Sequence, residues 1–118
     1  METKPLKMKD KTLIPKCGIA TDFMSRFWGL MGRTEMSAEE ALLFPKCNSI
    51  HMFFMKISLD IVFLAKDGTV VEVIEGLPPW RMLLPRRKVA HTLEMATGLA
   101  RKLGIVPGEK LDWGGGVN

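Results

Sequence analysis

Short runs of apolar residues separated by turn residues dominate the sequence and predict a series of short strands. Two of the clearest runs, residues 61–65 and 69–74, lie on either side of Asp67-Gly68. Asp-Gly is a preferred pair for a two-residue hairpin turn, because both residues tolerate a left-handed backbone. We therefore predict an antiparallel hairpin over residues 61–74.

The first third of the chain predicts one strand followed by one amphipathic helix. Apolar residues at 13–19 indicate a strand, and Pro15 places it at a sheet edge or near a strand start, since proline donates no hydrogen bond to a neighbouring strand. Apolar side chains recur with the period of an α-helix over residues 23–31. Asp22 suits the N-cap of this helix, and Gly32 suits its end.

Turn-forming residues divide the rest of the chain. Ser37 and Glu40 have the spacing of a capping box, but Pro45 leaves room only for a turn that leads into a strand. Three prolines within residues 76–88 exclude a long helix and predict an irregular connection. The remaining predicted elements are a strand at 89–95, a helix at 97–103 and a last strand at 110–113.

These elements predict a mainly β fold (α+β by content). We expect a compact single-domain antiparallel sandwich or partly closed barrel, with one short N-terminal amphipathic helix and a second short helix near the C-terminus. The 118 residues, 47% of them apolar, suffice for one core without disulfides or a structural metal. We predict a flexible basic lead-in at 1–11, one β-rich domain at 12–113 and a frayed tail at 114–118.

Charge and cysteine content bear on the protein's setting more than on its activity. The net charge of +4 arises from basic residues in 1–16 and 76–110 around an acidic middle, and such a surplus is usually a solvated face. The sequence shows neither an apolar secretory segment nor a run long enough to cross a bilayer. We therefore expect a cytoplasmic protein without membrane contact, in which Cys17 and Cys47 are reduced and not bridged to each other.

Two carboxylates stand within apolar, strand-like runs, where a charge is costly unless it is paired or hydrogen-bonded. Asp60 has Lys56 four residues before it, and Glu94 has equally apolar neighbours. The pair could act as acid and base, with His51 as a further candidate. The alternative is that Asp60 caps a turn and Glu94 faces solvent. We expect Asp60, and with it Lys56, to lie beside a water-accessible depression, because an unpaired carboxylate in the core is strongly destabilising.

Cys47 and His51 are four residues apart, a spacing that would unite two metal ligands, or a thiol and its base, on a helix. On a strand the same spacing separates them by about 13 Å, too far for a shared zinc ion. Packing roles are therefore favoured over a metal site. The sequence also contains no phosphate-binding or dinucleotide-binding motif, so we expect no cofactor.

The segment from Trp80 to Lys88 combines an aromatic side chain with four basic residues. It could stack on and neutralise a nucleic acid strand, but no nucleic-acid-binding motif accompanies it. A loop that Trp80 anchors to the core is the simpler interpretation. We do not expect a nucleic acid partner, and an anionic ligand or a protein partner stays open.

Several short motifs together resemble the domain of unknown function family 192. They occur in order over residues 17–113 and are Gly29-Leu30-Met31-Gly32-Arg33, Phe54-Met55-Lys56, Leu59-Asp60-Ile61-Val62-Phe63-Leu64, Leu93-Glu94 and the turn from Gly104 to Glu109. The resemblance implies a mainly β, sandwich-like domain and no particular activity. The matching positions to test first are Arg33, Met55, Lys56, Asp60 and Glu94.

The favoured function is a small, non-enzymatic binding or accessory protein, because few polar groups gather and no catalytic constellation is visible. Its candidate ligand-binding residues are Arg33, Met55, Lys56, Asp60, Trp80 and Arg81. An enzyme that uses Asp60 with Glu94 or His51 is the first alternative. Binding of a nucleic acid or anionic partner through residues 80–88 is the second. A pocket that holds Asp60 would favour chemistry, and a flat surface near Trp80 would favour a partner.

Overall fold

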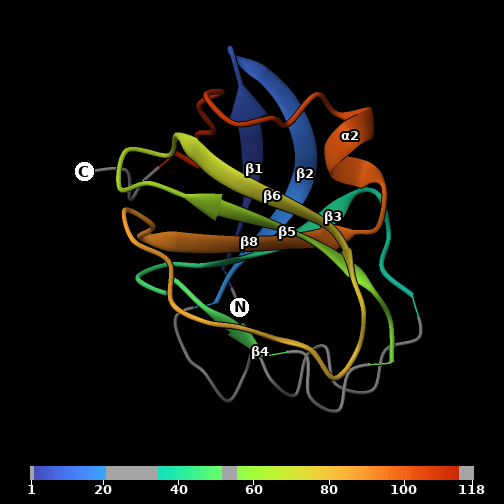
Figure 1. Cartoon of the computed structure of the whole chain (residues 1–118). Coiled ribbons are helices and arrows are strands. Elements are labelled where there is room, and N and C mark those ends of the chain that lie inside the picture. Colours follow the sequence, from blue (N-terminus) through green and yellow to red (C-terminus); the bar gives the residue numbers. More distant parts are fainter. Residues whose placement is uncertain (1, 21–34, 52–55, 115–118) are drawn as a thin grey trace.

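Six strands form one open sheet in the computed structural model, which describes residues 2–20, 35–51 and 56–114 (Figure 1). Neighbouring strands are antiparallel except for one parallel pair, the second and third in spatial order. That order is β1 (Glu2–Met8), β2 (Lys11–Ile19), β3 (Glu40–Phe44), β8 (His91–Ala96), β5 (Leu59–Leu64) and β6 (Val70–Leu77). The predicted mainly β fold is confirmed, as a sheet that stays open and is not wholly antiparallel.

Two smaller elements accompany this sheet. β4 (Ile50–His51) pairs with β7 (Met82–Leu83) in a two-stranded sheet, and α2 (Leu99–Lys102) is one turn of helix. β4 lies apart from the six-stranded sheet, toward the bottom of Figure 1. Within the described ranges, no helix has the length and apolar character needed to cross a membrane.

The antiparallel hairpin predicted over residues 61–74 is confirmed, but its turn spans Lys66, Asp67 and Gly68, since the Ala65 N–H donates to the Thr69 carbonyl oxygen. β5 and β6 pair antiparallel, Gly68 adopts a left-handed φ of 92°, and the Asp67 carboxylate accepts the Thr69 N–H at 2.9 Å. The turn before β3 is confirmed as well, since the Glu40 carboxylate accepts the Ser37 N–H at 3.0 Å. Both turns depend on contacts within a few residues, which the sequence reveals directly.

The flexible lead-in predicted at residues 1–11 is wrong over most of its length. Residues 2–8 form β1, which pairs with β2 through a turn at Lys9 and Asp10, both left-handed with φ of 52° and 64°. Only Leu6 of this strand is fully buried, so the apolar pattern that identifies a strand is almost missing from β1.

Pro15 lies within β2, which pairs with β1 on one side and, only from Lys16 to Ile19, with β3 on the other. The pairing of β1 with β2 steps from Lys4–Cys17 to Leu6–Ile14, which leaves Pro15 and its successor opposite one residue of β1. This arrangement is a β-bulge, a site where a strand tolerates proline. Pro15 therefore lies at a bulge rather than at the strand start, on a stretch of β2 that does not pair with β3.

The six-stranded sheet is apolar on both faces. On one face, here called the α2 face, Val62, Leu64, Leu93 and Met95 belong to a cluster that also includes Leu99 of α2. The opposite face, here called the β7 face, carries a second cluster that Leu83 of β7 packs against. The cluster on the β7 face includes Leu42, Phe44, Leu59, Ile61, Phe63, Leu77 and Val89. A side chain on the six-stranded sheet is therefore buried in one cluster or the other, according to the face on which it lies.

The C-terminal segment joins the two edges of the open sheet. The last strand predicted at 110–113 is absent, and its residues instead make isolated bridges, Lys110 with Thr69 beside β6 and Asp112 with Lys7 in β1. Within the predicted helix at 97–103, only α2 is helical. The helix predicted at 23–31 lies outside the described residues.

Candidate functional site

Asp60 is fully buried in β5 and binds three backbone N–H groups. Its Oδ1 accepts the Gly76 N–H at 2.8 Å, and its Oδ2 accepts the N–H groups of Gly98 at 3.0 Å and Ala100 at 3.1 Å. The predicted position beside a water-accessible depression is wrong, as is a cap on a turn leading into its own strand. The carboxylate is instead held inside the fold by these three backbone N–H groups.

The partners of Asp60 explain why the carboxylate sits there. Gly98 is the N-cap of α2 and has no side chain to accept the first N–H groups of that helix. Asp60 supplies this acceptor from a different strand, and the anionic carboxylate also suits the positive end of the helix. The same carboxylate ties β6 to α2 through Gly76. Asp60 thus connects three elements of the α2 face.

Glu94 lies on the opposite face of the sheet from Asp60. In the pairing of β5 with β8, Asp60 is opposite Met95, whereas Glu94 is opposite Ile61. Successive side chains on a strand point to opposite faces, so the two carboxylates stand back to back. Glu94 is 2% exposed, which contradicts its predicted solvent-facing position. The structure does not bring Asp60 and Glu94 together as an acid and base pair.

The other predicted site residues do not gather around Asp60. Lys56 is exposed in the segment before β5, and the described part of the chain has no ion pair between it and Asp60. Arg33, Met55 and the side chain of His51 lie outside the described structure. Among the residues that are described, no three metal-ligating side chains form a cluster.

Cys17 and Cys47 are not bridged to each other, as predicted. Burial raises the pKa of the Cys17 thiol to about 12, so this side chain is a protonated, unreactive part of the core at neutral pH. The Cys47 thiol donates to the Ser49 carbonyl oxygen at 3.2 Å, a contact within its own loop. These contacts fit the packing roles that the sequence favoured for the cysteines.

His91 is a buried titratable residue at the start of β8, for which the sequence alone predicted no role. Its Nδ1 accepts the Lys46 N–H at 3.1 Å, and its ring meets that of Trp113 edge to face at 5.3 Å. Burial lowers the pKa of His91 below its usual 6.5, although the Lys66 backbone opposes this effect. The neutral ring is therefore favoured in the folded protein.

We expect His91 to make the folded state sensitive to acid. Because its pKa is lower in the folded than in the unfolded chain, its contribution is complete above about pH 6.5 and is lost as the pH falls below that value. The slope from this one group is at most about 1.4 kcal/mol per pH unit. Urea unfolding at several pH values should show a shallower acid dependence for His91→Gln, and identical slopes would contradict the prediction.

The connection between β6 and β8 carries a cluster of exposed apolar side chains. Trp80 is 60% exposed, Met82 47% and Leu84 64%, and these are three of the five large apolar side chains exposed among the described residues. Exposed basic residues lie beside them in sequence: Arg81 stands between Trp80 and Met82, and Arg87 and Lys88 come after Leu84. We call this set the 80–88 surface: Trp80, Arg81, Met82, Leu84, Arg87 and Lys88. The interpretation of Trp80 as a core anchor is wrong, given its exposure.

Arg86 and Leu83 provide the anchor instead. The Arg86 guanidinium bonds Glu72 of β6 at 3.0 Å, lies 5.5 Å from the Phe63 ring centroid, and donates to the Leu84 carbonyl oxygen at 3.2 Å. The side chain of Leu83 packs on the β7 face. Arg86 and Leu83 thus hold the loop to the β7 face of the sheet, while the side chains of the 80–88 surface are exposed to solvent.

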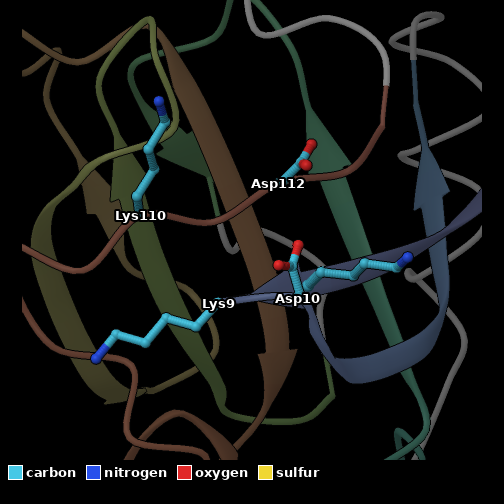
Figure 2. Close-up of a pocket in the computed structure, with 5 residues that line it drawn as sticks. Lys9, Asp10, Lys110 and Asp112 are labelled. Carbon is cyan, nitrogen blue, oxygen red and sulfur yellow. The ribbon is translucent and has the colours of Figure 1, made fainter.

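A depression of about 330 Å³ lies at the turn between β1 and β2, away from the predicted site residues. Figure 2 shows its labelled lysines, Lys9 and Lys110, extending in different directions from the wall. Lys9 also pairs with Glu109 at 3.8 Å. These charges are exposed and mixed in sign, so they define no convergent ligand site. The five lining residues are Lys7, Lys9, Asp10, Lys110 and Asp112.

The fold and the 80–88 surface describe a small mainly β domain with buried carboxylates and an exposed apolar and basic loop. The chain belongs to the family DUF192 (Uncharacterized ACR), whose model matches residues 5–113. A UPF0127 protein from Pyrococcus abyssi is 34% identical, covering 95% of this chain and 93% of that protein. A UPF0127 protein from Thermococcus sibiricus is 32% identical, covering 91% and 71% respectively.

Two crystal structures have similar folds. A protein of unknown function from Novosphingobium aromaticivorans has a TM-score of 0.77 and 30% identity, covering 92% of this chain and 84% of that one. A "putative transcription regulator" from Sinorhizobium meliloti has a TM-score of 0.80 and 26% identity, covering 94% and 93%. The family and fold are thereby established.

Proposed function

We propose that this protein is a non-enzymatic binding domain that holds a macromolecular partner on the 80–88 surface. The observation that carries the proposal is the concentration of Trp80, Met82 and Leu84 in one exposed, anchored loop. Gathered apolar side chains at a protein's surface mark interaction sites more often than single ones do. The separation of Asp60 from Glu94 onto opposite faces supports binding over acid and base chemistry.

The backbone at Trp80 adds a second argument. Its φ of 66° is left-handed, a conformation that bulky residues rarely adopt and that is unfavourable by about 1 to 3 kcal/mol. Glycine would meet this backbone requirement without strain. A large, exposed, strained tryptophan is therefore poorly explained by stability alone, and binding accounts for it.

A photo-crosslinking amino acid at position 84 tests the proposal in cells that express the protein. The matched control carries it at position 106, where Val106 is also apolar and 50% exposed. We expect discrete crosslinked products from position 84 and none from position 106. Adding Trp80→Gly should reduce the products about tenfold and should not lower the free energy of unfolding by more than about 1 kcal/mol, because glycine relieves the left-handed strain. Equal products from both positions would contradict the proposal.

A further inference from the structure

We infer that the partner held by the 80–88 surface is a polypeptide in which apolar side chains are flanked by carboxylates. This inference rests on the proposed function and adds the chemistry of the partner. A nucleic acid strand is the competing class. A polypeptide and a nucleic acid strand would bind surfaces that differ in their apolar side chains, their charge and their rigidity.

The apolar part of the surface suits a protein better than a nucleic acid. Protein interfaces are enriched in tryptophan, methionine and arginine, and their strongest contacts often involve tryptophan and arginine. Single-stranded nucleic acids instead require planar side chains on which bases stack. Only Trp80 is planar and apolar here, whereas Met82 and Leu84 are flexible aliphatic groups that gain most from other apolar side chains.

The positive charges of the 80–88 surface favour a partner that carries a small number of acidic groups. Residues 78–88 contain four basic side chains and no acidic one. One of them, Arg86, already pairs with Glu72 at 3.0 Å. The three others, Arg81, Arg87 and Lys88, are exposed. Nucleic-acid-binding proteins commonly neutralise about 6 to 10 phosphates, so three cations are a weak basis for such binding but suffice to select carboxylates around an apolar contact.

The anchored loop also suits a specific contact with a folded or folding polypeptide. Arg86 fixes the Leu84 carbonyl oxygen, and its backbone N–H donates to the Asn48 carbonyl oxygen at 3.1 Å. Leu83 is held against the sheet. The loop therefore gives up little conformational freedom on binding, so three apolar side chains can contribute more of their burial to affinity.

The test measures fluorescence anisotropy of labelled probes with the full-length protein. The first probe is a short peptide of leucine, tryptophan and glutamate. Its two matched peptides replace either the apolar residues with serine or the glutamates with glutamine, and a short thymidine DNA strand is the fourth probe. We expect the first peptide to bind about tenfold more tightly than each of the other three, a difference of about 1.4 kcal/mol.

Variants show whether this binding uses the 80–88 surface. The double variant Met82→Ser, Leu84→Ser should lose the preference for the apolar peptide, and the control Val106→Ser should keep it. Both alter exposed side chains, so circular dichroism should show the same fold. Tighter binding of the DNA strand, equal binding of the serine peptide, or an unchanged preference in the double variant would each overturn the inference.

The crosslinked products show whether a failed result contradicts only the polypeptide partner or also the proposed binding function. Products from position 84 that a nuclease leaves unchanged, together with the expected peptide preference, would support the inference. Products that a nuclease degrades would leave the proposed function standing and overturn the polypeptide partner. A lack of products from position 84 would overturn both.

Discussion

Replacing Asp60 with asparagine should lower the free energy of unfolding by about 2 to 4 kcal/mol. An amide oxygen at the position of Oδ2 can still accept the N–H groups of Gly98 and Ala100. The amide nitrogen would then face the Gly76 N–H, placing two donors against each other in a fully buried site. The negative charge that strengthens all three bonds is lost as well.

Asp60→Ala should be more harmful, by about 3 to 6 kcal/mol, because it leaves all three backbone N–H groups without this acceptor. Urea unfolding measures both losses, and Asp10→Asn is the matched control. Asp10 is exposed with a φ of 64°, which asparagine adopts readily, so this control should be nearly neutral. Any partner affinity per folded molecule should be unchanged in Asp60→Asn. Stability equal to the parent protein, with lost binding, would contradict the structural role.

The sequence predicts that the Asp60 carboxylate must be hydrogen-bonded, but it does not show which groups bind it. A carboxylate between apolar strand residues must be hydrogen-bonded, and that much follows from elementary energetics. Its partners lie 16, 38 and 40 residues further along the chain, and they are backbone groups of Gly76, Gly98 and Ala100. Because every residue except proline carries the same backbone N–H, the sequence does not reveal which of them will bind Asp60. The partner that the sequence suggested was the side chain of Lys56.

The faces of Asp60 and Glu94 depend on strand register, which the sequence does not determine over such a separation. A slip of one residue between β5 and β8 would reverse every face relation between these strands and bring the two carboxylates to the same face. Local chemistry, in contrast, was enough for the turn at Asp67-Gly68. β1 was missed because it buries only Leu6 fully, so the apolar pattern that marks a strand is almost missing, and because a bulge interrupts its pairing with β2.

The exposure of Trp80 on the 80–88 surface could not be predicted from the sequence either. Its apolar ring beside a proline-rich loop predicted a core anchor, but Trp80 is 60% exposed and Leu83 packs against the β7 face in its place. Arg86, which the sequence presents as one more surface charge, supplies the anchor through Glu72 and Phe63. The basic and aromatic segment at residues 80–88 can be singled out from the sequence, but which of its side chains are exposed and which anchor the loop required the fold.

Replacing Phe63 with alanine should lower the free energy of unfolding by about 3 to 5 kcal/mol. Phe63 is fully buried on the β7 face, so its removal leaves a cavity within an inner strand of the sheet. Phe63→Leu keeps most of the volume and should cost less than about 1.5 kcal/mol. Denaturant unfolding of both variants measures this difference, and a loss below about 1 kcal/mol in Phe63→Ala would place the ring outside the core.

The same ring lies beneath the Arg86 guanidinium, so Phe63 also links the core to the 80–88 surface. Phe63→Leu removes the aromatic face from Arg86 but retains an apolar support, and its folded form should keep the Glu72 ion pair. We therefore expect Phe63→Leu to weaken binding of the acidic, apolar peptide by a smaller factor than the double variant Met82→Ser, Leu84→Ser. A loss equal to that of the double variant would mean that the apolar side chains bind only when the aromatic support beneath Arg86 is intact.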